Sequence, residues 1–510
     1  MKKIILSAVA AVATLSLVGC NTDFDNDVQD IKITSGEANF TKYVALGNSL
    51  TSGFRDNALY IDGQNESYPS MLAQQMKLAG GGEFVQPMMA DNIGGLLLGS
   101  TQIQATKLYI SGFNNGSPVL SNAAGTPSTN ILTPVTGAIN NFGVPGAKSY
   151  HLIAPGYGNA AGVAMGASNP YFVRFASSPS TTVLADAVAA APTFYSLWIG
   201  NNDVLGYATS GGVGVNQTGN TTPSTYGASD ISDPNVVAGS IQQIMQSMKT
   251  AGVKGGVVAN IPAVTSIPFF TTVPYNPVSP SALGSNLATL NASLYGPLKQ
   301  VLTAYGQGDR LELLSATSAN PVLIIDETLT DMSAQIAGAL TPSMGAAMAG
   351  QFGAIFGKAR QTKDGDKILL STSSVIGTTA PGYPSPVNLY GITLPLEDKY
   401  VLTKSEVAEV ITATNAYNTK IKELANMYDL AFVDAHAKME ELNQTSGILF
   451  NGVKYNAKFV TGGSFSLDGV HLTGRGYAIV ANEFIKAINV KYKSTLPQVN
   501  ANNYSGVKFP

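Results

Sequence analysis

Four short segments, far apart in the chain, contain side chains that could act together in one reaction. They are Gly47-Asn48-Ser49-Leu50, the glycine Gly146, Gly200-Asn201-Asn202-Asp203 and Asp468-Gly469-Val470-His471. A serine hydroxyl, an imidazole and a carboxylate suit nucleophilic attack on an acyl carbonyl, because the imidazole can take the proton of the hydroxyl. The reaction also needs hydrogen-bond donors for the oxyanion that forms, and backbone N–H groups or side-chain amides can serve.

The spacing of Asp468 and His471 is the most informative of these patterns. A carboxylate three positions before an imidazole on a turn can hydrogen-bond to one ring nitrogen, which leaves the other nitrogen for Ser49. With 20 aspartates and 3 histidines in 510 residues, roughly 0.12 such pairs are expected by chance. The spacing therefore favours a working pair over an accident.

Apolar runs in the chain predict buried parallel strands that would position these residues. The runs are Tyr43 to Leu46, Phe194 to Ile199, Gly256 to Ile261 and Leu430 to Val433, and each reaches a turn or polar residues at its carboxyl end. Continuous apolar runs of this length are typical of strands covered on both faces. Because ligands bind at the carboxyl ends of such strands, Ser49 is expected at a binding edge.

Helical patterns cover three ranges, 233–252, 403–424 and 473–488. The first begins with Asp-Pro, in which the aspartate can cap free backbone N–H groups and the proline tolerates the first turn. The second begins with Thr-Lys-Ser-Glu, a capping box, and apolar residues at helical spacing follow. Strands that alternate with helices predict an α/β fold with a doubly wound, mostly parallel sheet.

The motifs near both ends predict one catalytic domain from about residue 41 to 492, followed by a tail at 493–510. Two large insertions are expected within it. Residues from about 55 to 190 are rich in Gly, Ser, Asn, Thr and Pro, which predicts long decorated loops, and the second insertion is at about 268–398. Its Ala, Gly and Met-rich run at 337–356 fits a buried helical hairpin, or a lid or acyl-binding surface.

Residues 1–20 resemble a bacterial lipoprotein signal. Two lysines precede an apolar run from Ile4 to Val18, and Leu17-Val18-Gly19-Cys20 ends the segment. An ordinary signal peptide or a membrane anchor is the alternative, but the run is short for a spanning helix, which needs about 20 apolar residues. Lipid on Cys20 would attach the protein to a membrane.

Acidic residues after Cys20 predict a flexible tether at 21–40. An acidic stretch at this place resembles the surface-export signal of lipoproteins from Bacteroidetes-like bacteria. We therefore expect an exported protein that is lipid-anchored to the cell envelope at the outer membrane, with surface exposure and inner-leaflet attachment as alternatives.

The composition excludes several partners. Charged residues are 12% of the chain and the net charge is −3, so there is no basic field for nucleic acid or anionic lipid. Cys20 is the only cysteine, so the mature chain has no internal disulfide and no thiolate metal site. The other two histidines, His151 and His436, are far apart in sequence, and we expect no zinc site, no other cofactor and no catalytic role for them.

The order and local sequence of the four segments resemble the GDSL or SGNH hydrolase family of esterases and lipases. The matching blocks are Gly47 to Leu50, Asn141 to Ala147, Gly200 to Asp203 and Asp468 to His471. The resemblance covers the framework from about Lys42 to Tyr492 but not most of the insertions, and it implies a flavodoxin-like sheet. An asparagine at position 48, where the family usually has aspartate, puts local geometry in question more than activity.

The resemblance implies a role for each block. Ser49 is the nucleophile, His471 the general base and Asp468 the carboxylate that orients His471. The implied oxyanion donors are the N–H of Gly146, with Gly143 as the alternative, the side-chain amide of Asn202 and the N–H of Ser49. Asp203 is expected to hold the loop.

These roles predict a serine esterase or lipase that forms an acyl-enzyme on Ser49. Its substrate would be an ester of a lipid, an acylated glycan or a small alcohol, and the residues leave these open. The alternative from a different class is a surface-exposed, non-catalytic protein that binds glycan or another cell-surface component on the same scaffold. The complete catalytic set favours the enzyme.

Overall fold

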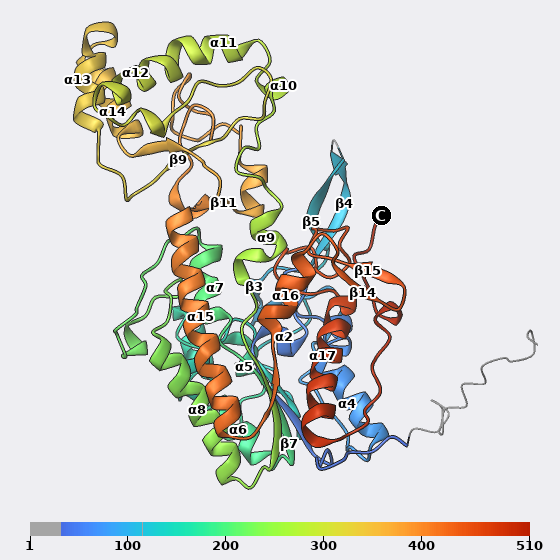
Figure 1. The fold of residues 1–510 in the computed structure, drawn as a ribbon. Helices are drawn as coiled ribbons and strands as arrows, with labels where there is room; N and C mark the ends of the chain where they lie inside the picture. Colours follow the sequence, from blue (N-terminus) through green and yellow to red (C-terminus); the bar gives the residue numbers. More distant parts are fainter. Residues whose placement is uncertain (1–31, 115) are drawn as a thin grey trace, which may run out of the picture.

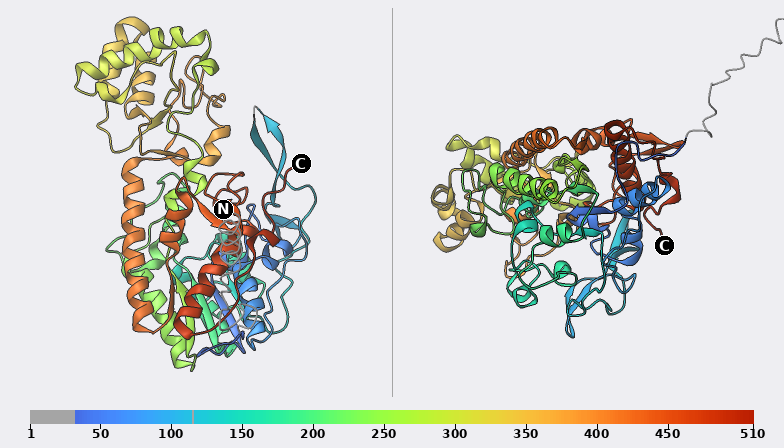
Figure 2. Two further views of the ribbon diagram at one scale, coloured as in Figure 1. Left: turned by 45° about the vertical axis from the view of Figure 1, so that its right-hand side comes forward. Right: turned by 90° about the horizontal axis from the view of Figure 1, so that it is seen from below.

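The computed structural model describes residues 32–114 and 116–510 (Figure 1). The expected lipoprotein signal, Cys20 and the acidic residues before position 31 lie outside these residues. The described chain has a lower part built around a parallel sheet and an upper part formed by one long insertion (Figures 1 and 2). Within the described ranges, no helix is both long and apolar enough to cross a bilayer.

Five strands form the central sheet of the lower part. They are β1 (Tyr43–Gly47), β6 (Asn141–Gly143), β7 (Phe194–Trp198), β8 (Gly255–Ala259) and β13 (Ala431–Val433). Their order across the sheet is β13-β8-β7-β1-β6, and all neighbouring pairs are parallel. Counted along the chain, this is the 2-1-3-4-5 order of flavodoxin-like sheets, so the predicted α/β class is confirmed.

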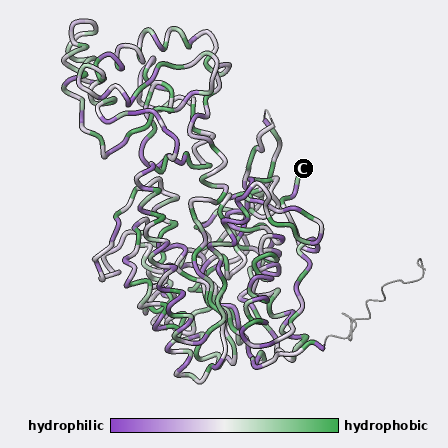
Figure 3. The backbone as a smooth tube through the Cα atoms, viewed as in Figure 1, coloured by the Kyte–Doolittle hydropathy of each residue, from purple (hydrophilic) through white to green (hydrophobic). Residues whose placement is uncertain are grey.

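Helices cover both faces of this sheet (Figure 1). On one face lie α6 (Val183–Ala189), α8 (Pro234–Thr250) and α15 (Lys404–Met427), and on the other lie α4 (Tyr68–Leu78) and α17 (Gly474–Tyr492). All three predicted helix starts are present, because the side chains of Asp233 and Thr473 cap α8 and α17, and Thr403 and Glu406 form a capping box on α15. Hydrophobic residues run along the strands between these layers (Figure 3), and β1, β7 and β8 are buried along their whole length.

The prediction of decorated loops over residues 55–190 is wrong for three segments. The strand β6 and the helices α4 and α6 belong to the sheet layers. In β6 only three residues pair with β1, and two asparagines lie at its start, so no apolar run marked it. The remaining α-helices and strands of this range are α3 (Ile61–Asn65), α5 (Pro170–Val173) and the hairpins β2 (Leu96–Leu98) with β3 (Thr101–Gln104) and β4 (Leu108–Asn114) with β5 (Ser117–Asn122).

The expected flexible tether does not extend to residue 40. Phe40 is buried and its ring meets the ring of Phe194 edge-on, with 5.0 Å between centroids. The N–H of Glu37 donates to the carbonyl of Tyr492 at 2.7 Å. Aromatic burial and backbone pairing with the end of α17 order this stretch, and the tail at 493–510 also packs, with Leu496 buried.

The second insertion has its own hydrophobic core, formed by residues between Val273 and Val401. Its elements are α9 (Pro268–Thr271), α10 (Pro280–Leu283), α11 (Asn286–Leu290), α12 (Gly296–Ala304), β9 (Leu323–Ile325), α13 (Ser333–Met344), α14 (Ala346–Phe356), β10 (Ala359–Gln361), β11 (Lys367–Ile368) and β12 (Val401–Leu402). The Ala, Gly and Met-rich run is a helical hairpin, α13 and α14, which buries Ile336, Leu340 and Phe356 in this second core. It lies at the end of the insertion that is remote from α2 (Ser49–Ser52) (Figures 1 and 2), so this hairpin does not cover Ser49.

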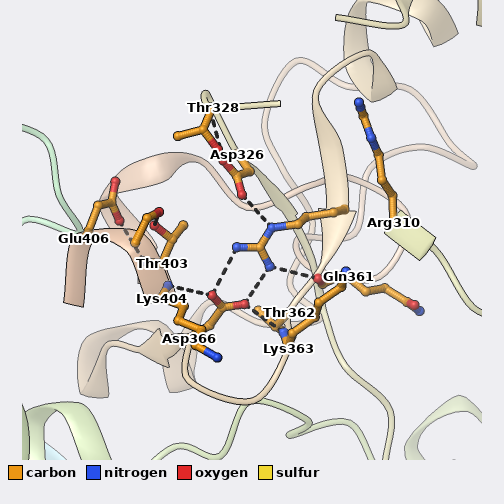
Figure 4. Close-up of polar contacts among 12 residues, drawn as sticks. Arg310, Asp326, Thr328, Gln361, Thr362, Lys363, Asp366, Thr403, Lys404 and Glu406 are labelled. Atoms are coloured by element: carbon orange, nitrogen blue, oxygen red, sulfur yellow. Dashed lines mark hydrogen bonds and ion pairs between the residues drawn. The ribbon is translucent and has the colours of Figure 1, made fainter. Parts of the chain in front are cut away.

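A buried ion network joins the insertion to the sheet layers (Figure 4). Arg360 in β10 donates to Asp326 at 2.6 Å and to both oxygens of Asp366 at 2.6 and 3.0 Å. Asp366 also accepts the backbone N–H of Lys404, the first residue of α15, at 2.9 Å. Since α15 packs on α8 and on the sheet, the network ties the insertion to a helix of the lower part.

Candidate active site

Ser49 lies at the turn between β1 and the short helix α2. Asn48 caps this helix by accepting the N–H of Leu50 at 3.1 Å. Position 47 requires glycine, because a Cβ there would lie 2.1 Å from the hydroxyl of Thr51 and 2.4 Å from the carbonyl of Trp198. The tight strand-to-helix turn therefore presents Ser49 at the carboxyl edge of the sheet, where it is 8% exposed.

The structure brings Ser49, His471 and Asp468 together. Nε2 of His471 lies 2.9 Å from Oγ of Ser49, and Nδ1 of His471 lies 2.9 Å from Oδ2 of Asp468. The two contacts are on opposite nitrogens of one ring, although Ser49 and His471 are 422 positions apart. This arrangement allows His471 to accept the serine proton while the carboxylate stabilises the resulting charge.

Asp468 is held by donors on both of its oxygens. Oδ1 accepts the N–H groups of Val470 at 2.9 Å and His471 at 2.8 Å, and Oδ2 accepts the N–H of Asn57 at 2.9 Å. Burial alone would raise the pKa of Asp468, but the neighbouring His471 and these hydrogen bonds lower that pKa well below its ordinary value. The carboxylate is therefore ionised whenever His471 needs an anionic partner.

A segment that the sequence patterns did not single out supports the pair. Phe54 packs against the ring of His471 with 4.7 Å between ring centroids. Asp56 accepts the N–H of Leu467 at 3.0 Å, just before Asp468. Asp56 and Asn57 have left-handed backbone angles, with a φ of 52° for Asp56 and 60° for Asn57. Only a few non-glycine residue types tolerate this conformation. The Asp-Asn dipeptide was the available turn signal.

The segments that carry the three expected oxyanion donors adjoin the turn of Ser49, because Val144 donates its backbone N–H to the carbonyl of Gly47 at 3.0 Å and Asn48 donates to Asn201 at 3.1 Å. Among the residues described, the backbone N–H groups of Ser49 and Gly146 donate no hydrogen bond. Asn202 begins α7 (Asn202–Thr209) and donates one amide N–H to the carbonyl of Ala147 at 2.9 Å, which leaves its second N–H available. Gly143 is unsuitable, because its N–H already donates to Asn141 at 2.9 Å, so Gly146 is the better of the two glycines.

Asn48 also connects the first block to the third. Its Nδ2 donates to Oδ1 of Asn201 at 3.1 Å while its Oδ1 caps α2. A carboxylate could keep the cap but could not make the donation to Asn201. The asparagine at position 48 thus fits the asparagine at position 201, and the departure from the usual aspartate leaves the position of Ser49 intact.

Asp203 has the structural role that was expected. It is fully buried, accepts the N–H of Ser149 at 2.7 Å and the hydroxyl of Ser149 at 2.9 Å. Burial raises the pKa of Asp203, although the hydrogen bonds from Ser149 oppose that rise. These contacts fix the chain that follows Gly146 against α7.

The other two histidines contact residues outside this triad. His436, in α16 (Ala435–Asn443), donates its backbone N–H to Asn260 at 2.9 Å and has its ring near Asn418. His151 follows Gly146 and lines a hollow beside it. In the described ranges, no group of three or more His, Cys, Asp or Glu residues is placed to hold a metal ion.

The insertion directly contacts the loop that carries Asp468 and His471. Phe269 in α9 donates its backbone N–H to the carbonyl of Gly469 at 3.0 Å. Gly469 has a φ of 70°, and a Cβ there would lie 2.8 Å from the side chain of Leu370. The loop that carries Asp468 and His471 is therefore clamped from outside by the insertion.

Comparison with known proteins gives structural matches only. No family model matches the chain, and no curated protein matches it. An acetylxylan esterase variant from Geobacillus stearothermophilus is 11% identical over 91% of this chain and 98% of its own, with a TM-score of 0.31. A GDSL-like lipase from Parabacteroides merdae is 9% identical over 90% and 99%, with a TM-score of 0.31, and an extracellular lipase from Streptomyces rimosus is 11% identical over 88% and 99%, with a TM-score of 0.30.

Proposed function

We propose that the protein is a serine hydrolase of carboxylic esters, of the GDSL or SGNH type, with Ser49 as nucleophile. The observation that carries the proposal is the pair of 2.9 Å contacts that His471 makes with Ser49 and Asp468. They join residues from both ends of the chain at the ligand-binding edge of the sheet. An intact set of this kind favours hydrolysis over the non-catalytic binding alternative.

The reaction follows from these contacts. His471 takes the proton of Ser49 as Oγ bonds to the ester carbonyl carbon, and the carbonyl electrons move to oxygen. His471 then gives that proton to the alcohol oxygen as the C–O bond breaks, which leaves an acyl-enzyme. Water attacks the acyl carbon, His471 takes its proton and returns it to Ser49, and the carboxylic acid departs. Asp468 stabilises the protonated ring in both halves.

The oxyanion that forms in each half-reaction needs donors on one side of the acyl carbon. We assign them to the N–H groups of Ser49 and Gly146 and to the free amide N–H of Asn202. Glycine suits this position because it has no side chain to keep the substrate oxygen away. Neutral donors of this kind each contribute roughly 3 to 4 kcal/mol of transition-state stabilisation.

The test is hydrolysis of a p-nitrophenyl ester series from acetate to palmitate by the full chain and by Ser49→Ala. We expect turnover by the native protein and its loss in the variant, with Ser293→Ala, at an exposed serine of the insertion, unchanged. A fluorophosphonate probe should label Ser49 once per chain. Retained turnover by a folded Ser49→Ala protein would overturn the proposal.

We also propose that the protein is exported and held at the outer membrane by lipid on Cys20, with the folded part facing the cell exterior. The proposal is supported by the apolar run and the Leu-Val-Gly-Cys ending of the first 20 residues. Cells fed an alkyne fatty acid should label the native protein but not Cys20→Ser. Label on Cys20→Ser, or none on the native protein, would contradict it, and protease treatment of intact cells would test surface exposure.

A further inference from the structure

A hollow of about 860 Å³ opens beside Gly146. It lies between the 3-10 segment Ser149–Ile153, which follows Gly146, and the first turns of α8. Because the N–H of Gly146 is an oxyanion donor in the proposed reaction, a substrate bound there has part of its structure next to this hollow. The volume is in the range of sites for small organic ligands, about 300 to 1,000 Å³.

Aromatic rings form much of the wall of the hollow. The ring of His151 stacks on Tyr157 with 4.4 Å between centroids and 13° between planes. Tyr150 meets Tyr226 edge-on at 5.7 Å. Ring faces and edges of this kind offer flat apolar surfaces in a fixed geometry.

The remaining wall mixes apolar and polar side chains and carries no formal charge. Of the 20 described residues that line the hollow, none is Asp, Glu, Lys or Arg, whereas serine, threonine and asparagine side chains are present. A phosphate or a carboxylate would find no cation there. Ser168, Asn169 and Ser240 already donate hydrogen bonds within the protein. Among the described residues, the side chains of Thr221, Ser224 and Asn235 make no such bond, so a long acyl chain would displace their water without replacing its hydrogen bonds.

His151, which lines this space, is a neutral hydrogen-bond donor. Its Nδ1 accepts the backbone N–H of Lys148 at 3.0 Å, so the ring proton is on Nε2. Burial, and to a smaller extent the Lys148 ammonium, lowers the pKa of His151 to about 4. The hydroxyl of Tyr150 has no hydrogen-bond partner in the part of the chain that the structure describes, so it too is available to a ligand.

From this lining we infer that the hollow binds the alcohol part of the substrate, and that this part is a neutral sugar unit. A sugar ring has an apolar C–H face that packs on aromatic rings, and hydroxyl groups around its edge that pair with neutral donors and acceptors. With the acyl carbonyl at Gly146, the ester alcohol can extend into the space between His151, Tyr150 and Tyr226. The substrate class is therefore an acyl ester of a neutral glycan, an assignment that rests on the proposed esterase activity.

The test compares three esters with the full chain. They are p-nitrophenyl acetate, a partially acetylated neutral oligosaccharide such as acetylated cellotriose, and p-nitrophenyl palmitate, which has a long acyl chain. In Tyr150→Ala, the ratio of kcat/KM for the sugar acetate to that for p-nitrophenyl acetate should fall about tenfold, chiefly through KM. Tyr305→Ala, at a 55% exposed tyrosine of the insertion, is the matched control and should keep the ratio.

Other outcomes overturn the inference. If Tyr150→Ala lowers the palmitate activity and spares the sugar acetate, the hollow is an acyl groove. Equal losses on all three esters would mean that Tyr150 only supports the loop of Gly146. An unchanged ratio would mean that the sugar does not reach the hollow.

A binding measurement separates this inference from the proposed reaction. Ser49→Ala protein should bind unacetylated cellotetraose by calorimetry, and the double variant with Tyr150→Ala should bind it about tenfold more weakly. Sugar binding without any Ser49-dependent hydrolysis would defeat the esterase and leave a glycan site. Hydrolysis of p-nitrophenyl acetate without sugar binding would defeat only the glycan assignment.

Discussion

Replacing Asp468 by asparagine tests the triad with a change of a single atom. Oδ1 of Asp468 accepts two fixed backbone N–H groups, from Val470 and His471. Oδ2 accepts one, from Asn57, and faces Nδ1 of His471 at 2.9 Å. An asparagine has one carbonyl oxygen and one NH2 group, so the NH2 group must replace one of these two acceptors.

The two orientations differ in cost. An NH2 group at the Oδ1 position would oppose two backbone donors, whereas at the Oδ2 position it opposes only the N–H of Asn57. An unpaired buried donor costs about 1 to 3 kcal/mol, so we expect the NH2 group at the Oδ2 position. There it donates to Nδ1 of His471, and the ring proton must move to Nε2. That nitrogen then points a proton at Ser49 and cannot accept one.

The wrong tautomer has a large effect on the chemical step. In a Ser-His-Asp triad this exchange lowers kcat about ten-thousand-fold, which corresponds to about 5.4 kcal/mol at 1.36 kcal/mol per factor of ten. We expect that loss in Asp468→Asn with p-nitrophenyl acetate, and KM within about threefold, because Asp468 does not contact the substrate.

The matched control is Asp434→Asn. Asp434 also accepts a backbone N–H, from Ala437 at 3.0 Å, but it caps α16 away from the triad. It should keep native kcat, and thermal unfolding should show that both variants are folded. A folded Asp468→Asn protein with kcat within tenfold of the native value would refute the reasoning.

Three further perturbations test the site and its surroundings. Asn202→Ala should lower kcat by roughly a hundred- to a thousandfold without unfolding the protein. Steady-state kinetics should show this loss in kcat with a KM close to the native value. A loss of kcat under threefold would remove Asn202 from the oxyanion site. Gly469→Ala should lower kcat about ten- to a hundredfold, since a Cβ 3.1 Å from the N–H of Phe269 displaces the loop of His471, and native kcat would contradict the clamp. His151→Gln should flatten the pH dependence of the free energy of unfolding. The pKa of His151 is about 4 in the folded protein and 6.5 in the unfolded chain, so the stability that the neutral ring provides above pH 6.5 is lost as the pH falls toward 4. Denaturant titrations at pH 7 and 4.5 should show a loss of about 2 to 3 kcal/mol in the native protein that the variant lacks. Equal slopes in both proteins would count against it.

Short-range patterns in the sequence predict the residues of the candidate site without reference to the fold. The hydrogen bond between Asp468 and His471 spans three positions, and the cap of α2 spans two, so both are determined by local geometry. The strands β1, β7 and β8 are buried on both faces, and their apolar runs showed it. Capping residues before α8 and α15 marked where those helices begin.

Other parts depended on contacts that no local pattern encodes. β6 is three residues long, too short for a periodicity, and it joins the sheet only because β1 offers a free edge. The support from Phe54 and Asn57 comes from a stretch rich in small and polar residues, in which turn and loop look alike. Even the choice between Gly143 and Gly146 depended on whether an asparagine side chain occupies the N–H.

The sequence by itself determined which side chains could react and which strands and helices carry them, because those properties arise from neighbours a few positions apart. Only the tertiary structure decided that Ser49 meets His471 across 422 positions, that the insertion clamps Gly469, and that an uncharged aromatic hollow adjoins Gly146. These features arise from packing of the sheet layers, where the order and register of strands place distant segments side by side. Such packing is set by the whole buried core and not by any one segment.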